Sequence, residues 1–235
     1  MIQIPKDSEL KKIGGHLGHL REFLHPSFKP YVELIKNKMV YIDLKKTREL
    51  LKQAVDFLKK QKRESIVWVG TKPIAKDFIK QIGEGLGQAY VAEKWLGGML
   101  TNFETLKKNL KNLQALKDQE ETREFKEMTK KEKRIIQQKR ARLEKVLAGL
   151  KELKELPQVL IIVDPHFEHV AISEARKKNI KIIGICDVTT NLWQIDYPIP
   201  LNDESRLALE KILTLLARVF KKNFCFKETK NKTKK

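Results

Sequence analysis

The sequence predicts an α/β fold in which a parallel sheet is flanked by helices and interrupted by a long, basic helical hairpin. Short apolar runs rich in β-branched residues alternate with segments of helical periodicity. Such alternation is typical of a parallel sheet covered on both faces. A charged middle segment instead repeats its apolar residues along a narrow helical seam. With 235 residues, 41% of them hydrophobic, the chain can bury one substantial core and carry an appendage.

The predicted strands and helices alternate along the chain. Apolar residues spaced three and four apart predict a helix over residues 44–58 and a final helix over residues 207–219. A further helical segment, residues 171–178, precedes the last strand. The strands are predicted at residues 40–42, 65–69, 159–163 and 180–186.

The middle of the chain predicts an antiparallel coiled-coil hairpin. Apolar residues at positions 103, 106, 110 and 113 follow a three-four-three spacing, and those at 136, 143 and 150 repeat every seven residues. Thr129 is a predicted N-cap, and Glu132 completes a capping box. We therefore expect a discontinuous α/β domain (residues 1–102 and 155–222), a hairpin insertion (103–154) and a basic flexible tail (223–235).

The charge predicts a polyanionic partner. Lys and Arg number 49 against 30 Asp and Glu, which gives a net charge of +19 and a pI near 9.8. Residues 107–154 alone hold sixteen Lys or Arg and eight acids. Helical i,i+4 pairs cannot neutralise a two-to-one excess, so we expect part of the hairpin surface to meet phosphate. The basic tail is expected to touch RNA as well.

Several protein classes are disfavoured. The longest apolar runs are far short of the roughly 20 residues that cross a bilayer. The N-terminal residues resemble neither a secretory signal nor a transit peptide, so we expect the chain to act where it is made or to have lost its leader already. The two cysteines, Cys186 and Cys225, are too few for a structural zinc site and fit a reducing compartment.

A glycine-rich segment just before the hairpin is the first candidate site. Its paired glycines allow close backbone approach, and its polar side chains can donate to phosphate or sugar. Trp95 either offers a stacking face for a base or is simply buried. The candidate RNA-binding residues of this segment and of the hairpin start are Lys94, Trp95, Gly97, Gly98, Thr101, Asn102, Lys107, Lys108 and Lys111.

The N-terminal region holds a comparable cluster. It mixes flexible backbone, cations and aromatic rings ahead of the first predicted strand, and it could lie against RNA through phosphate and 2′-OH contacts. The candidate residues are His16, Gly18, His19, Arg21 and Lys29.

Enzymatic alternatives have weaker support. The turn at Gly70, Thr71 and Lys72 follows a strand and could face an anion, but neither glycine-rich nucleotide motif is present. The pairs His16/His19 and His166/His169 could hold an incidental ion, or they are plain hydrogen-bonding histidines. With no recognisable nucleophile motif, we expect no catalytic residue, cofactor or metal. The rival hypothesis is a nucleotide- or metal-dependent enzyme working near Gly70, Asp164 and Asp187, at the carboxyl edge of the sheet.

Several distinctive runs of residues follow one another over roughly residues 10–220. They are Gly15-His16-Leu17-Gly18-His19 with Pro26-Ser27-Phe28-Lys29-Pro30-Tyr31, Val69-Gly70-Thr71-Lys72, Lys94-Trp95-Leu96-Gly97-Gly98-Met99-Leu100-Thr101-Asn102, Leu156-Pro157, Asp164-Pro165-His166-Phe167-Glu168-His169-Val170-Ala171, and Ile199-Pro200-Leu201-Asn202-Asp203. In content and order, these landmarks strongly resemble those of the small-subunit ribosomal protein S-two family in its bacterial and organellar form.

The resemblance implies a flavodoxin-like (Rossmann-like) parallel sheet with a coiled-coil insertion. It also implies a structural role between the head and body of the small subunit, where the protein grips small-subunit ribosomal RNA and neighbouring ribosomal proteins, among them the large mRNA-binding protein numbered first. The expected location is on the ribosome, in the cytoplasm or inside an organelle, with no membrane or small-molecule partner.

Two positions depart from the family pattern. Lys94 stands where the family usually has Arg, so a bidentate phosphate contact would become a single-point one. Residues 187–193 replace the common D-T-N-x-D-P pattern and lack its second Asp and its Pro, which puts a metal or polar site at that loop in doubt.

Overall fold

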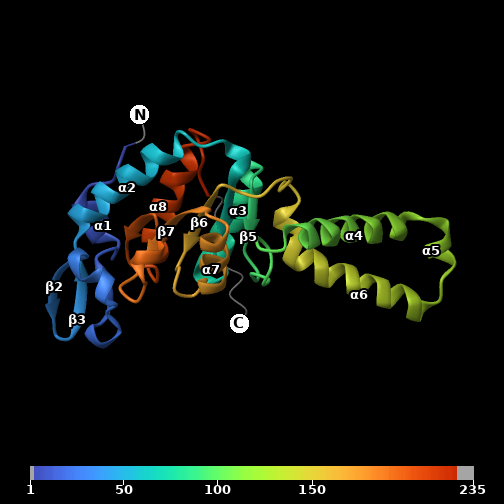
Figure 1. Ribbon diagram of the computed structural model, residues 1–235, viewed down its shortest axis with the longest axis horizontal. Helices are drawn as coiled ribbons and strands as arrows, with labels where there is room; N and C mark the ends of the chain where they lie inside the picture. Colours follow the sequence, from blue (N-terminus) through green and yellow to red (C-terminus); the bar gives the residue numbers. More distant parts are fainter. Residues whose placement is uncertain (1–2, 227–235) are drawn as a thin grey trace, which may run out of the picture.

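The structure is a computed structural model that describes residues 3–226, except the side chain of Lys126. It is the predicted α/β fold, built on a five-stranded parallel sheet (Figure 1). Taken in chain order within this sheet, the strands lie 2-1-3-4-5, which is the flavodoxin-like arrangement. From one edge to the other the strands are β5 (Ala89–Val91), β4 (Ile66–Val69), β6 (Val159–Val163), β7 (Lys181–Cys186) and β8 (Tyr197–Pro200).

Successive side chains of the central strands point to opposite faces of the sheet and build two cores. Trp68 and Ile161 belong to the first core, whereas Val67 and Leu160 belong to the second. The helices over the first core are α1 (Asp7–Lys12), α2 (Leu44–Leu58), α3 (Pro73–Leu86) and α8 (Arg206–Arg218).

Helix α7 (His169–Lys177) packs on the opposite side of the sheet. The second core also contains Phe28 from the N-terminal region and Trp95 from the segment that follows β5. We call this side, which carries α7, residues 94–102 and the N-terminal residues 16–42, the α7 face.

The prediction that residues 40–42 belong to the parallel sheet is wrong. They lie in β3 (Met39–Ile42), the middle strand of a separate antiparallel sheet between β1 (Leu17–Leu20) and β2 (Val32–Lys36). Asn37 and Lys38 have φ angles of 51° and 64°, which is the backbone of a two-residue hairpin turn. A short apolar run fits either kind of sheet, because its periodicity does not specify a partner strand.

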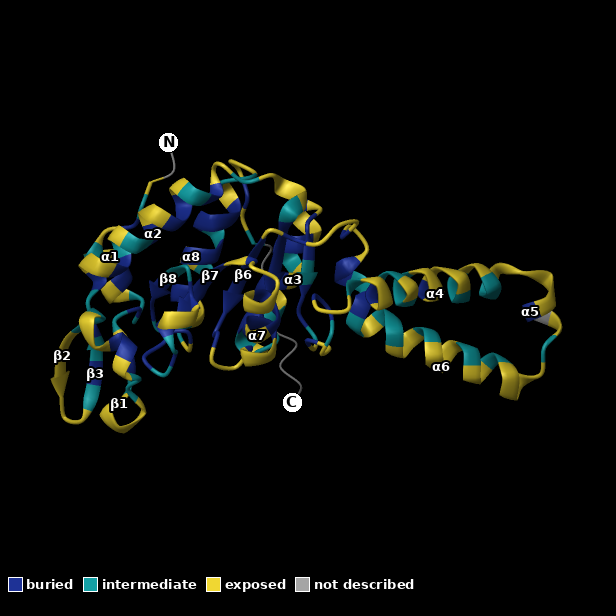
Figure 2. Cartoon of the chain, viewed as in Figure 1, coloured by how far each residue is buried: buried dark blue, intermediate teal, exposed yellow. Residues whose placement is uncertain are grey.

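The hairpin consists of α4 (Phe103–Glu121), the short α5 (Arg123–Glu127) and α6 (Lys130–Leu147). It extends from the β5 side of the sheet (Figure 1), and most of its buried residues lie near its base (Figure 2). The predicted capping box of Thr129 and Glu132 is confirmed. Among residues 3–226, no helix has the length and apolar character needed to cross a membrane.

The predicted start of the flexible tail, residue 223, lies too early in the chain. Phe224 is buried at 5% exposure, and its ring meets that of Phe226 at 5.3 Å between centroids. Phe226 also lies 4.8 Å from Phe78 of α3. The chain therefore stays packed against the first core at least to residue 226, because these rings remove apolar area from water. The rest of the predicted tail, residues 227–235, lies outside the described residues.

The base of the hairpin is attached to the sheet through a close contact at Gly149. This glycine lies in a single 3-10 turn, Ala148–Leu150, that follows α6. A Cβ atom placed there would lie 2.3 Å from the carbonyl oxygen of Tyr90 in β5 and 2.8 Å from its ring. Only glycine lets the returning chain approach the edge strand this closely.

We expect Gly149→Ala to lower the free energy of unfolding by about 3 kcal/mol, the upper end of ordinary overpacking, because the Tyr90 backbone must move. Urea denaturation, monitored by circular dichroism, measures this change in the free energy of unfolding. Gly97→Ala is the matched control, since nothing lies within 4 Å of its added Cβ. Equal stability of the two variants would contradict the close contact.

Candidate nucleic-acid interface

The glycine-rich segment 94–102 is folded around one buried carboxylate, Glu174 of α7. Glu174 Oε1 accepts hydrogen bonds from Trp95 Nε1 at 3.2 Å and from the Gly98 amide at 2.7 Å. Oε2 accepts from the Leu100 amide at 2.9 Å and from Thr101, through its amide at 3.0 Å and its hydroxyl at 3.1 Å. Both carboxylate oxygens are thus used to fix the loop that leads into the hairpin.

The electrostatics of Glu174 agree with this geometry. Burial alone would raise the pKa of Glu174, but the amides of Thr101, Leu100 and Gly98 stabilise the carboxylate, and the pKa is lowered below its ordinary value. The sequence did not lead us to this residue. A signal was present, because an acid beside Ile172 and Ala175 falls on the apolar stripe of its helix, and buried acids require partners.

We expect Glu174→Gln to lower the free energy of unfolding by about 2–3 kcal/mol, because the amide NH2 would face N–H and O–H donors and leave them unsatisfied. The loss should be smaller in acid, because the stabilisation by the wild-type carboxylate declines once the pH falls below the ordinary pKa and is gone below the lowered pKa of the folded state. Chemical denaturation at neutral and acidic pH measures both effects. Glu121→Gln, at an exposed position of α4, is the control. Similar unfolding curves for both variants would refute this role of Glu174.

The structure settles the two alternatives for Trp95 in favour of burial. Trp95 is 9% exposed, so its ring offers no stacking face to solvent. Gly98 has a φ of +93°, a backbone conformation that favours glycine. The other candidates of this segment are at the surface or partly so: Lys94, Gly97, Thr101 and Asn102 are exposed, and Gly98 is half-buried.

The three candidate lysines at the start of the hairpin differ from one another. Lys107 is partly buried, pairs with Glu104 at 3.2 Å and lies 5.0 Å above the Phe103 ring. Lys108 and Lys111 are exposed. The structure therefore leaves Lys108 and Lys111 more accessible to a partner than Lys107.

Part of the acid content of the hairpin is used between its own helices. Glu144 of α6 pairs with Lys117 of α4 and, at 3.2 Å, with Arg140. Arg140 Nε also lies 2.9 Å from Glu120 Oε1. These carboxylates neutralise cations along the seam, so the excess positive charge remains on the outer surfaces of the hairpin.

The N-terminal candidates divide in the same way. Arg21 and Lys29 are exposed, His16 and His19 are half-buried, and Gly18 is buried. A Cβ at Gly18 would lie 2.6 Å from a methyl group of Val188, so this glycine serves packing. Arg21 and Lys29 are the members of the cluster that most readily reach a partner.

The two candidate groups lie on one face but at opposite ends of the sheet (Figure 1). The glycine-rich segment follows β5, one edge strand, whereas residues 14 and 15 hydrogen-bond Asn202, just after β8, the other edge strand. Both groups contribute side chains to the second core, on the α7 face. They form two ends of one long surface rather than a single compact site.

His19 links the N-terminal sheet to the carboxyl edge of the parallel sheet. Its Nδ1 contacts Asp187, and its Nε2 lies 3.3 Å from Glu204. Partial burial would lower the pKa of His19, but attraction to Asp187 and Glu204 outweighs burial, and the pKa is raised. The altered loop at residues 187–193 therefore keeps a polar site at Asp187.

A raised pKa in the folded state means that the charged form of His19 stabilises the fold. This stabilisation is complete below the unfolded pKa, near 6.5, and is lost as pH rises through the folded-state pKa. We expect His19→Gln to be less stable than wild type in mild acid, with a difference that shrinks at alkaline pH. Thermal melting from mild acid to alkaline pH measures this difference in stability, with His169→Gln as the control. A difference independent of pH would contradict the ion pairs.

The usual ligand position in this fold is the carboxyl end of β4 and β6, where the helices that follow the two strands, α3 and α7, lie on opposite faces of the sheet. This position is occupied by the protein's own charges. Lys72 Nζ lies 3.1 Å from Asp164 and 3.0 Å from Asp203, and Glu168 accepts a hydrogen bond from the Thr71 amide at 2.7 Å. Burial and the neighbouring Asp164 raise the pKa of Asp203 to about 7, in spite of Lys72. Such carboxylates would repel the phosphates of a nucleotide. Within residues 3–226, no group of three or more His, Cys, Asp and Glu side chains is placed to hold a metal ion.

Comparison with known proteins decides the family. The profile of the family described as Ribosomal protein S2 matches residues 10–223. The chain belongs to this family. A curated relative named small ribosomal subunit protein uS2, from Endomicrobium trichonymphae, is 41% identical over 212 residues, which cover 88% of this chain and 86% of the relative.

Membership in the Ribosomal protein S2 family gives the chain a structural role in the small ribosomal subunit and excludes the enzyme hypothesis. The geometry also explains the longest family landmark, residues 94–102. The amides of Gly98, Leu100 and Thr101 donate to Glu174, and the buried Trp95 donates to the same carboxylate through Nε1. In this chain the residues of the landmark therefore mainly stabilise the fold of the loop. Its exposed side chains that do not bond to Glu174 remain available to contact a partner.

Proposed function

We propose that this Ribosomal protein S2 family member binds small-subunit ribosomal RNA through its α7 face and the adjoining hairpin. The observation that carries the proposal is the separation of charge on the hairpin. Along the seam, Glu120 and Glu144 form ion pairs with cations of the hairpin itself. Lys108 and Lys111, in contrast, are exposed to solvent. Lys94 is exposed just before them, on the loop that Glu174 fixes.

The proposed mechanism is passive. The parallel sheet is a stiff support, and the loop and hairpin place lysines at defined positions along the RNA backbone. Each lysine that neutralises a phosphate releases counterions, so binding should weaken steeply as salt rises. Arg21 and Lys29, at the other end of the α7 face, would make the second set of phosphate contacts and fix the orientation of the protein.

The same proposal includes the protein's surroundings. We infer a place between the head and body of the small subunit, with contacts to neighbouring ribosomal proteins, among them the large mRNA-binding protein numbered first. In that position the protein would support subunit assembly and translation, on the ribosome in the cytoplasm or inside an organelle. Sucrose-gradient fractionation of cell extract tests this, because the protein should travel with small ribosomal particles and be stripped by high salt.

The triple variant Lys94→Gln, Lys108→Gln and Lys111→Gln should bind more weakly to small-subunit particles that lack this protein. The slope of log affinity against log salt should become shallower by about 0.7–0.9 for each phosphate that a lysine no longer neutralises. Titration of depleted particles with labelled protein at several salt concentrations measures the slope.

The matched control changes three lysines over the first core, Lys59, Lys80 and Lys211, to Gln. Their side chains are 50–58% exposed, and the total change in charge is the same. This variant should retain the wild-type salt slope. Equal effects of the two triple variants would mean that binding follows net charge alone and would refute a specific interface on the α7 face.

A further inference from the structure

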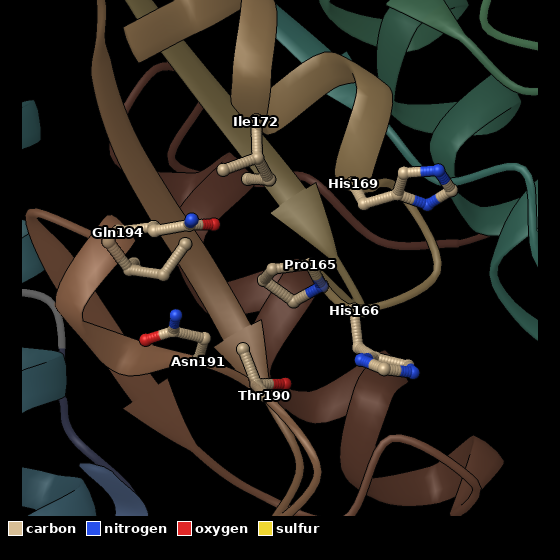
Figure 3. Close-up of a pocket in the computed structure, with 8 residues that line it drawn as sticks. Pro165, His166, His169, Ile172, Thr190, Asn191 and Gln194 are labelled. Atoms are coloured by element: carbon tan, nitrogen blue, oxygen red, sulfur yellow. The ribbon is translucent and has the colours of Figure 1, made fainter. Parts of the chain in front are cut away.

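A cavity of about 210 Å³ opens on the α7 face where α7 begins (Figure 3). The apolar part of its lining includes Ile172 and Ile195, which belong to the second core. The polar part comes from the segment that joins β6 to the first residue of α7 and from the segment that follows β7, and none of the lining side chains is acidic. These polar residues are His166, His169, Thr190, Asn191 and Gln194.

Thr190 gives this cavity an unmet hydrogen-bonding group. The residue is 1% exposed, and its hydroxyl oxygen has no hydrogen-bond partner among residues 3–226. Buried polar groups are nearly always satisfied, so an unpartnered hydroxyl lining a cavity indicates that a polar ligand group belongs there.

Trp193 stands beside the cavity, between the lining residues Asn191 and Gln194. It lies in the 3-10 turn η5 (Leu192–Gln194) and is 73% exposed, whereas Trp68 is fully buried and Trp95 nearly so. Its ring and that of His25 form a T-shaped pair with 5.5 Å between centroids, and the indole remains largely exposed beside it. An exposed indole on an ordered turn is suited to stacking on a planar partner.

This turn is continuous with the N-terminal candidate cluster. The Leu192 amide donates to the Ser27 hydroxyl at 2.9 Å, and the His25 amide donates to the Val188 carbonyl. Lys29 is exposed two residues beyond Ser27. A chain of nucleotides bound at Trp193 would therefore have a cation available for its phosphates.

Size and chemistry select the ligand. The cavity is smaller than the roughly 300–1,000 Å³ of pockets that hold drug-sized molecules, so it takes a group of the size of one ring system. Amide, hydroxyl and imidazole groups can hydrogen-bond the edges of an unpaired base, and a neighbouring aromatic ring can stack another.

We propose that the cavity and Trp193 bind two consecutive unpaired nucleotides of RNA, one base inside the cavity and the next stacked on the indole. The site deepens the proposed function, on which it rests, by adding recognition of single-stranded RNA to contacts with phosphate. A base edge in the cavity would satisfy the Thr190 hydroxyl, and stacking would cover Trp193.

The test uses the full chain and labelled RNA hexamers, single-stranded or annealed into a duplex, with affinity measured by fluorescence anisotropy. We expect the single strand to bind more tightly and Trp193→Ala to weaken it about tenfold, the loss typical of one stacked base. Trp193→Phe should retain most of the affinity. Thr190→Val should also bind more weakly, since it removes the hydroxyl and keeps the shape of the side chain.

Leu207→Ala is the control, because Leu207 is 60% exposed on α8, over the first core. It should bind the hexamer as wild type does. Iodide quenching gives a second readout: Trp193 is the accessible indole among the described residues, and bound RNA should protect it. Unchanged affinity in Trp193→Ala, equal binding of duplex and single strand, or protection of Trp193 by ribosomal proteins but not by RNA would each overturn the proposal.

Failure of this inference is distinguishable from failure of the proposed function. Trp193→Ala with wild-type affinity for the hexamer, together with reduced particle binding by the triple lysine variant, would remove the base site alone. A wild-type protein that did not bind depleted particles at any salt concentration would remove the proposed function, whatever the hexamers showed.

Discussion

The position of the hairpin depends on a single buried carboxylate. Glu174 accepts five hydrogen bonds from the loop between β5 and α4, and this loop sets where the hairpin leaves the body. A carboxylate can do this because it is an acceptor only and has room for several donors. The contact of Gly149 with Tyr90 fixes the returning end of the hairpin. A long basic appendage is thus oriented by contacts at its base, with its outer surface left for a partner.

The two faces of the sheet are covered by different kinds of structure. One face carries four helices that bury a broad apolar core, whereas the other combines α7 with loops and the small antiparallel sheet. Loops and short elements expose more backbone and polar side chains than helices do, so this face is the richer in potential contacts. Its two candidate groups lie at opposite sheet edges, a spacing that suits an extended polyanion better than a small molecule.

The sequence predicted the parallel sheet and the hairpin because both depend on local periodicity. Continuous apolar runs such as Val159–Val163 are distinctive, and the capping box at Thr129 identifies the second hairpin helix. Partner choice is not local, which is why β3 was assigned to the wrong sheet and why the short strands β5 and β8 were missed. Glu174 was missed for the same reason: its donors lie 73 to 79 residues away along the chain.

The carboxyl edge of the parallel sheet shows why this fold serves as a scaffold here. In related folds the strand ends leave a crevice for a ligand. In this chain Lys72 pairs with Asp164 and Asp203 in that place, and Glu168 occupies the Thr71 amide that would otherwise meet an anion. Removing one member of these ion pairs to make room for a ligand would leave the other charge buried without a partner, which is costly. Because the usual site is closed by internal ion pairs, the proposed RNA binding uses the surface of the α7 face and the hairpin instead.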